Sequence, residues 1–349
     1  MSKKETCLRY TGSMQQLAYV RPVTYGEGRA HGLSGFELKN GLMSMKIIAD
    51  KCLDVSEFSY RGIQFNFLSK PGLQGRNPYD TNGAEAQRSI MGGLFFTCGM
   101  ENVCAPCVLD GKDYPMHGRI RTTPAEHVSS DACWVGDDYV VSVSGEMREA
   151  ELFGENLSLR REIVTNLGEK SFTLTDTICN EAFRDEPCLL LYHCNMGYPF
   201  LNEHSVLHLP SVEVHGREAW ATVHIADWEH MEPAKDAEAE YVYKHRLGAH
   251  PNGDTLAMVE NPALGLGLAI RFNRNQLSNF MQWKSIASGD YVLGLEPTNA
   301  DALGRAKALH GGKLPCLKPM ETIRIQLTFT VLDSAQELQA CKDEIASLK

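Results

Sequence analysis

A histidine and an asparagine stand out in the apolar stretch of residues 189–201 as groups that could do chemistry. Side chains two residues apart on a strand point to the same face, so a buried strand here would present His193 and Asn195 together. A proton donor held there would suit a polyhydroxylated substrate. The alternative is a core histidine that is satisfied by a backbone carbonyl, because buried polar groups find partners.

A carboxylate lies at the end of a second apolar run, where Glu296 precedes Pro297. Glutamate is rarely buried without a partner, because its charge is costly to desolvate, so we expect Glu296 to face a cleft or a cation. Burial raises the pKa of a carboxyl group and a neighbouring imidazolium lowers it. An ionised Glu296 and a protonated His193 could therefore coexist near neutral pH as base and acid. A structural salt bridge is the alternative.

Two further segments could bind a sugar. His117 and Arg119, in a His-Gly-Arg sequence, offer a second imidazole and a guanidinium whose forked donors suit vicinal hydroxyls; a turn with a surface arginine is the alternative. Trp283 and Lys284 offer an aromatic face and a cation, although a buried tryptophan is commonly part of the core.

The usual cofactor and nucleophile motifs are missing. Residues 265–268 (Gly-Leu-Gly-Leu) lack the third glycine and the following helix of a dinucleotide site, and there is no phosphate-binding loop or Gly-x-Ser-x-Gly elbow. Cys104 and Cys107 form a single Cys-x-x-Cys pair without the second pair of a zinc site or the context of a redox motif. We therefore expect no cofactor and no metal.

Length and composition are those of an ordinary globular protein. The 349 residues are 43% hydrophobic and 22% charged, and they could form one large β domain or two smaller ones. The net charge of −10 argues against a nucleic-acid partner, because phosphate binding needs a basic surface. A small neutral substrate is compatible with this charge.

The eleven cysteines are an odd number and lie mostly within apolar runs, which predicts reduced, buried thiols. The N-terminal residues lack the apolar core of a signal peptide, and no apolar segment reaches membrane-spanning length. We expect a cytoplasmic protein with no membrane partner.

Period-two alternation of apolar residues predicts half-buried antiparallel strands. It is clear in residues 139–143, 172–178, 266–272 and 323–331. The Asn40-Gly41 pair between two apolar runs predicts a hairpin. Many short strands and few helices predict an all-β sandwich or barrel, with residues 1–349 in a single domain.

Helical spacing is convincing only at the C-terminus, where a capping box begins at Ser334 and one apolar stripe follows it, formed by Leu338, Cys341, Ile345 and Leu348. The long polar loop of residues 69–88 is of a length that is usually functional or mobile. We interpret the acidic residues 227–240 as a solvated loop; contact of some of its carboxylates with substrate is the alternative.

With these residues in view, the chain resembles the aldose-1-epimerase (galactose mutarotase-like) superfamily, and within it the uncharacterised aldose-1-epimerase-like branch. The resemblance covers roughly residues 26–331. It is carried by residues 50–55 (Asp-Lys-Cys-Leu-Asp-Val), 92–102 (Gly-Gly-Leu-Phe-Phe-Thr-Cys-Gly-Met-Glu-Asn), 116–120 (Met-His-Gly-Arg-Ile), 192–197 (Tyr-His-Cys-Asn-Met-Gly), 282–284 (Gln-Trp-Lys) and 294–297 (Gly-Leu-Glu-Pro).

The resemblance implies a large antiparallel β-sandwich, the galactose mutarotase-like supersandwich, with the sugar on the concave face of one sheet. It implies that Glu296 takes the proton of the anomeric hydroxyl while His193 protonates the ring oxygen from the other side of the sugar. The ring then opens, turns about C1–C2 and closes as the other anomer. His117 would hold the substrate, and Arg88 lies about where such enzymes keep a substrate-binding arginine.

Two departures from the family pattern bear on the substrate. Lys51-Cys52 replaces the usual Arg-Gly, so the preferred sugar would be unusual if Asp54 or its neighbours touch it. Arg119 replaces a glycine of the mutarotases, and a cation in the cleft would favour an acidic, phosphorylated or keto sugar. The substrate-binding residues that we predict are His117, Arg119, Asn102, Arg88, Lys284, Asp54 and Asn195.

The expected partner is thus a small carbohydrate, and a homodimer is left open. Two other functions remain as alternatives. One is an isomerase or lyase of keto sugars or sugar acids, with a metal held by His117, His193 and Glu296, since two imidazoles and a carboxylate can bind one. The other is a sugar-binding protein without turnover.

Overall fold

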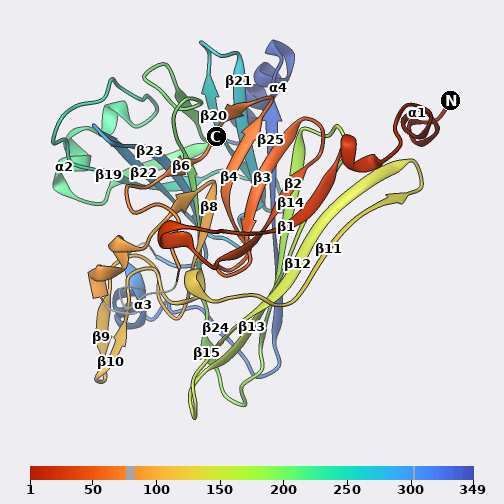
Figure 1. The fold of residues 1–349 in the computed structure, drawn as a ribbon. Helices are drawn as coiled ribbons and strands as arrows, with labels where there is room; N and C mark the ends of the chain where they lie inside the picture. Colours follow the sequence, from red (N-terminus) through yellow and green to blue (C-terminus); the bar gives the residue numbers. More distant parts are fainter. Residues whose placement is uncertain (76–82, 302) are drawn as a thin grey trace.

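Two large antiparallel sheets make up most of the computed structural model, which describes residues 1–75, 83–301 and 303–349 (Figure 1). The first sheet has eleven strands, in the order β1 (Tyr19–Thr24), β2 (Ser34–Lys39), β3 (Met43–Ile48), β4 (Asp54–Tyr60), β8 (Phe95–Met100), β16 (Leu189–Met196), β23 (Asp290–Thr298), β22 (Asn279–Ala287), β19 (Tyr241–Leu247) and β18 (Ser211–Gly216), with β5 (Ile63–Gln64) paired to β4.

The second sheet has eight strands and packs against the first. Its order is β11 (Glu126–Val135), β12 (Asp138–Ala150), β13 (Asn156–Asn166), β14 (Ser171–Asn180), β25 (Thr322–Leu332), β21 (Leu266–Asn273), β20 (Asp254–Asn261) and β17 (Val206–His208). Three two-stranded pairs complete the strands: β6 (Phe67–Leu68) with β7 (Gly92–Gly93), β9 (Cys107–Leu109) with β10 (Lys112–Tyr114), and β15 (Glu186–Pro187) with β24 (Cys316–Leu317).

The predicted strands are all present, although β21 is buried on both faces over most of its length where we expected a half-buried strand. In β14 every second residue is buried, and β25 alternates similarly over most of its length, as expected for strands with one face on the core. The hairpin joins β2 to β3, where the Asn40 side-chain oxygen accepts the backbone N–H of Met43 at 2.8 Å. The prediction of a single domain stays a prediction.

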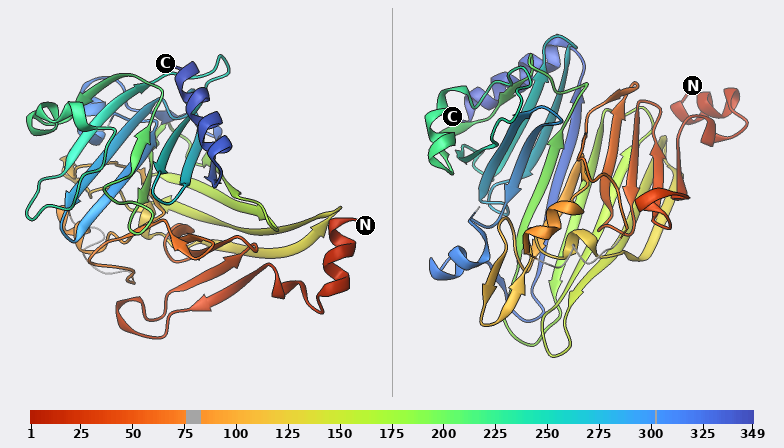
Figure 2. Two further views of the ribbon diagram at one scale, coloured as in Figure 1. Left: turned by 90° about the horizontal axis from the view of Figure 1, so that it is seen from above. Right: turned by 60° about the vertical axis from the view of Figure 1, so that its left-hand side comes forward.

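The predicted C-terminal helix is α4 (Ala335–Ser347), which buries Leu338, Cys341 and Ile345. Three α-helices were not predicted: α1 (Lys3–Tyr10), α2 (Ala219–Val223) and α3 (Gly304–His310). The sequence of α1 has no apolar stripe, and α1 accordingly buries no residue. Figure 2 shows it at the periphery of the molecule.

Short 3-10 helices connect the strands: η1 (Met14–Gln16), η2 (Gly28–Ala30), η4 (Gly83–Arg88), η5 (Ile120–Thr122) and η6 (Ile225–Asp227). In the described part of the chain, no helix has the length and apolar character needed to span a bilayer. Each of the eleven cysteines is free.

β16 separates two environments. All eight of its residues are buried, but alternate side chains point to opposite faces. Leu190, Tyr192 and Cys194 belong to the core between the two sheets. Leu189 and Leu191 pack in a separate apolar cluster on the face that points away from the second sheet, which we call the outer face.

A buried polar cluster, which we call the Arg161 cluster, lies on the inner face. Arg161 Nε and Nη2 donate to the two oxygens of Asp176 at 2.8 and 2.6 Å. Its Nη1 donates to Asp54 at 2.6 Å and to the Cys52 carbonyl at 2.9 Å, and Nη2 also reaches Thr97 Oγ1 at 2.8 Å. All five N–H groups of the guanidinium thus have acceptors, as a fully buried cation requires.

Candidate active site

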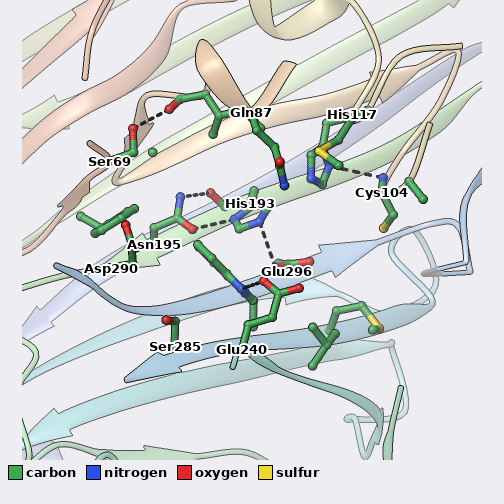
Figure 3. A pocket seen from close by; sticks show the side chains of 18 of the residues that line it. Ser69, Gln87, Cys104, His117, His193, Asn195, Glu240, Ser285, Asp290 and Glu296 are labelled. Atoms are coloured by element: carbon green, nitrogen blue, oxygen red, sulfur yellow. Dashed lines mark hydrogen bonds and ion pairs between the residues drawn. The ribbon is translucent and has the colours of Figure 1, made fainter. Parts of the chain in front are cut away.

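A cavity of about 1020 Å³ opens on the outer face of the eleven-stranded sheet (Figure 3). Its lining combines residues of β16, β22 and β23 with residues of connecting segments. The strands supply His193, Asn195, Met281, Trp283, Ser285 and Glu296, and the connections supply Gln87, Cys104, His117, Arg217, Glu218 and Glu240, among others.

His193 and Glu296 lie side by side on neighbouring strands. β16 pairs antiparallel with β23 and Cys194 stands opposite Leu295, so the adjoining positions His193 and Glu296 also face each other. His193 Nε2 lies 3.1 Å from Glu296 Oε1. The predicted acid and base therefore share one cavity, but they touch directly, whereas we expected them on opposite sides of a sugar ring.

Glu296 is 5% exposed. Its burial raises the pKa of the carboxyl group, while the charges of His193 and Arg217 oppose the rise. Gly294 leaves room for this arrangement. A Cβ at Gly294 would lie 3.2 Å from Glu296 Oε1 and 3.1 Å from the Cβ of Trp283, so a larger residue would crowd both side chains.

Aromatic rings fix the imidazole of His193 on several sides. The ring stacks on Phe96 with centroids 4.6 Å apart, and it forms T-shaped pairs with His117 and Trp283 at centroid distances of 5.5 and 5.3 Å. Such contacts lock the rotamer of a side chain that must be placed accurately for proton transfer.

His117 lies in the loop after β10 and lines the cavity. Its Nδ1 accepts the backbone N–H of Cys104 at 3.3 Å, so the remaining nitrogen, Nε2, carries the hydrogen of the neutral ring. Burial is the main cause that holds the pKa of His117 well below its usual range, and the charges of His193, Arg121 and Arg217 add to it. His117 is therefore a neutral donor, suited to a sugar hydroxyl.

One wall of the cavity was not predicted from the sequence. Arg217 follows β18 and approaches Glu240 at 3.4 Å, and the indole Nε1 of Trp283 donates to the same carboxylate at 2.8 Å. Arg217 and Glu218 lie between a short strand and a short helix, and no sequence pattern there marks them as binding residues. Glu240 belongs to the acidic residues 227–240. Its position agrees with the alternative hypothesis, in which carboxylates of this loop contact the substrate.

Lys284 points away from the cavity. On β22 the alternate residues Met281, Trp283 and Ser285 line the cavity, which leaves Lys284 on the other face. Its ammonium is buried there and donates to the carbonyls of Asp227 and His230 at 3.0 and 2.7 Å. Of the aromatic face and the cation that we expected from Trp283 and Lys284, only Trp283 lines the cavity.

Asp54 lies in the Arg161 cluster on the inner face, fully buried. Thr97 donates to it from its backbone N–H and from Oγ1, at 2.9 and 2.7 Å. It cannot reach a sugar in the cavity, because its side chain points to the opposite face of the sheet.

Three more predicted binding residues lie outside the described lining of the cavity. Asn102 is fully buried and holds its loop together, donating to the carbonyls of Ala105 and Pro115 at 3.0 and 2.8 Å. The Arg119 guanidinium binds Glu101 at 2.6 Å, so it does not bring its charge into the cleft. Arg88 has a side chain that is 68% exposed.

Asn195 is confirmed on the same strand face as His193, and it lines the cavity. Its side chain is nevertheless fully buried. The amide oxygen lies 2.6 Å from His193 Nδ1, and the amide nitrogen donates to the carbonyls of His193 and Gly93 at 2.9 and 3.4 Å. It has little left to offer a substrate.

The residues of the alternative metal site are only partly available. Nδ1 of His117 and Nδ1 of His193 are both engaged, with Cys104 and Asn195. Among the described residues, no three or more His, Cys, Asp or Glu side chains are grouped so as to hold a metal ion.

Comparisons with known proteins agree with this architecture. The family model "Domain of unknown function (DUF4432)" matches residues 30–331. No curated protein matches the chain.

Solved structures show the same fold. A candidate aldose 1-epimerase from Klebsiella pneumoniae is 22% identical, with a TM-score of 0.89 over 96% of this chain and 90% of that protein. A galactose mutarotase-like protein from Clostridium acetobutylicum is 12% identical, with a TM-score of 0.62 over 91% and 99% of the two chains. A galactose 1-epimerase from Lactobacillus acidophilus is 11% identical, with a TM-score of 0.56 over 91% of this chain and 99% of that protein.

Proposed function

Since the chain belongs to the DUF4432 family and has a galactose mutarotase-like fold, we propose that it is a carbohydrate epimerase that interconverts the anomers of a free sugar. The observation that carries the proposal is the contact of His193 Nε2 with Glu296 Oε1 at 3.1 Å on the floor of a large cavity. An acid and a base in contact can act on two oxygens of one ring.

In this reaction Glu296 accepts the proton of the anomeric hydroxyl, and the imidazolium of His193 gives its Nε2 proton to the ring oxygen. The C1–O5 bond breaks as the carbonyl forms at C1. Rotation about C1–C2 exposes the other face of the carbonyl. Closure reverses both proton transfers, so the enzyme returns to its initial state with no cofactor.

The charges around the cavity favour a neutral sugar. Among the described lining residues, five carboxylates (Glu218, Glu238, Glu240, Asp290 and Glu296) outnumber the four cations Lys70, Arg217, Lys307 and the imidazolium of His193. A phosphate or a sugar acid would meet repulsion there. The expectation of an acidic or phosphorylated sugar rested on Arg119, whose guanidinium is bound to Glu101 instead.

Polarimetry of freshly dissolved hexoses and pentoses tests the proposal. Glu296→Gln and His193→Asn should each lower the catalysed rate about 10²- to 10⁴-fold, because each removes one proton-transfer group. Circular dichroism should show that both variants stay folded. Unchanged rates in both would contradict the assignment.

The chain offers a matched control for these variants. His208 Nε2 lies 3.0 Å from Glu260 Oε2, a second histidine–glutamate pair on β17 and β20, outside the described lining of the cavity. Glu260→Gln should leave the rate unchanged.

The same preparation separates the two alternatives. Stoichiometric metal in the purified protein would favour a metal-assisted isomerase or lyase. Tight sugar binding by Glu296→Gln, together with no catalysis by the parent protein, would favour a sugar-binding protein.

A further inference from the structure

We infer that Asn195 is a positioning residue that fixes the proton of His193 on Nδ1 and thereby leaves the catalytic nitrogen, Nε2, to exchange a single proton with Glu296 and the sugar. This inference rests on the proposed function for its kinetic consequence. Its structural part concerns the resting protein alone.

The orientation of the Asn195 amide follows from its partners. A backbone carbonyl only accepts hydrogen bonds, so the side-chain atom that faces the carbonyls of His193 and Gly93, at 2.9 and 3.4 Å, must be the NH₂ group. The oxygen is then the atom that lies 2.6 Å from His193 Nδ1 (Figure 3). An amide oxygen has no hydrogen to donate, so Nδ1 must carry one.

This assignment determines which nitrogen of His193 exchanges a proton. A neutral ring with its hydrogen on Nδ1 has only a lone pair on Nε2. Nε2 lies 3.1 Å from Glu296 Oε1, so a proton on Nε2 makes the ring an imidazolium that pairs with the carboxylate. Because Nδ1 keeps its own hydrogen, the proton that moves in catalysis is the one on Nε2.

The position of Asn195 makes this arrangement rigid. It is fully buried, and its own backbone N–H donates to the Leu94 carbonyl at 2.7 Å. Since it lies two residues from His193 on the same face of β16, the strand itself holds the amide against the ring. Partners of this kind fix the tautomer and orientation of functional histidines.

Nitrogen NMR of histidine-labelled protein tests the structural part, because ring ¹⁵N shifts distinguish the two tautomers. The neutral form of His193 should carry its hydrogen on Nδ1. His117 provides an internal contrast, since its Nδ1 accepts the N–H of Cys104 and its hydrogen should be on Nε2. Finding the Nε2–H tautomer for neutral His193 in the parent protein would overturn the inference without any variant.

Two variants test the kinetic consequence. Asn195→Leu should lower kcat about 10- to 100-fold, the usual loss when such an orienting partner is removed, with KM within about twofold. Asn195→Asp keeps an oxygen for the Nδ1 hydrogen but loses the N–H donors to the carbonyls of His193 and Gly93, so it should retain more of kcat than Asn195→Leu and shift the pH profile of kcat to higher pH. An unaltered kcat and pH profile in Asn195→Leu would overturn the inference.

A buried asparagine elsewhere separates these effects from general destabilisation. Asn261 is also fully buried and donates to the Phe200 carbonyl at 2.7 Å, outside the described lining of the cavity. Asn261→Leu should lower the melting temperature but leave the His193 tautomer and kcat unchanged. If the parent protein turns over no sugar, the proposed function fails, and the NMR result alone decides on Asn195.

Discussion

The two faces of β16 carry two buried charged groups that differ in one respect. On the inner face, Tyr192 donates to Asp176 at 2.8 Å and joins the Arg161 cluster. On the outer face, His193 contacts Glu296 at 3.1 Å. Both groups are almost completely buried, so burial alone does not distinguish them.

The difference is in unused hydrogen-bonding capacity. Every N–H of Arg161 has an acceptor within the protein, so this cluster can bind nothing else and serves the fold. His193 and Glu296 border a cavity, where a ligand can use the free lone pairs of the carboxylate. A buried ionic group is therefore a candidate site when its hydrogen-bonding capacity is not fully used and a cavity reaches it.

The largest effect on stability should come from breaking the inner group. Arg161→Met leaves Asp54 and Asp176 buried without their cation, which should lower the free energy of unfolding by about 3–5 kcal/mol. Urea denaturation measures this loss. A loss below about 1 kcal/mol would show that the cluster is not the structural element that its saturation suggests.

An exposed ion pair provides the control. Arg271 forms two bonds to Glu344 at 2.6 and 2.7 Å, but its side chain is 43% exposed. Arg271→Met should therefore cost less than about 1 kcal/mol.

Glu296→Gln, on the outer face, should leave stability within about 0.5 kcal/mol of the parent value or raise it, because functional groups are commonly held at a cost in stability.

A smaller, pH-dependent effect should come from a buried carboxylate that has no cationic partner among the described residues. Glu149 is 6% exposed; its Oε2 accepts the Met100 N–H at 3.1 Å and its Oε1 has no partner among the described residues. Burial, and then the charge of Glu101, raise the pKa of Glu149 to about 8 from an ordinary value of 4.5.

The sign of the effect follows from proton binding. Between pH 4.5 and 8 the folded protein keeps a proton on Glu149 that the unfolded chain has lost, so stability falls as pH rises through this window. The glutamine of a Glu149→Gln variant cannot ionise, so the stability of this variant should not fall over the same pH range. The variant should therefore be more stable than the parent by about 1–3 kcal/mol at pH 8.5. Unfolding in urea at pH 5 and pH 8.5 measures the difference; equal pH dependence of the two proteins would contradict the shift.

The smallest effect should come from Arg119. Because its guanidinium binds Glu101 and does not line the described cavity, Arg119→Met should change kcat/KM for anomer exchange less than about threefold, the scale of a rim contact and not of a catalytic group. Polarimetry across the sugar panel measures this ratio. A larger loss of kcat/KM, confined to one class of sugar, would show that Arg119 contacts the substrate after all.

The sequence predicted the elements of the fold well because their signals are local. Alternation marked β12, β14, β21 and β25, and the Asn40-Gly41 pair marked the turn between β2 and β3. The sequence did not predict α1, whose side chains are all at least partly exposed. A helix without a buried face has no periodic stripe of apolar residues.

The binding residues were predicted less well than the acid–base pair. Trp283 and Lys284 are adjacent in the sequence, and alternation puts them on opposite faces of β22 without saying which face meets the cavity. The pairing of Met281 with Glu296 decides it, since residues opposite each other share a face. Arg217 and Glu240 reach the cavity from loops whose paths no local pattern encodes.

The sequence by itself determined that this protein is built of antiparallel strands and that His193 and Asn195 share one strand face, because the period of a strand is a local property of the backbone. Only the tertiary structure decided that Glu296 lies against His193 and that Asp54 and Lys284 turn away from the cavity. Strand pairing joins residues about a hundred positions apart, and the layer that covers each face of a sheet is chosen by the packing of the whole chain.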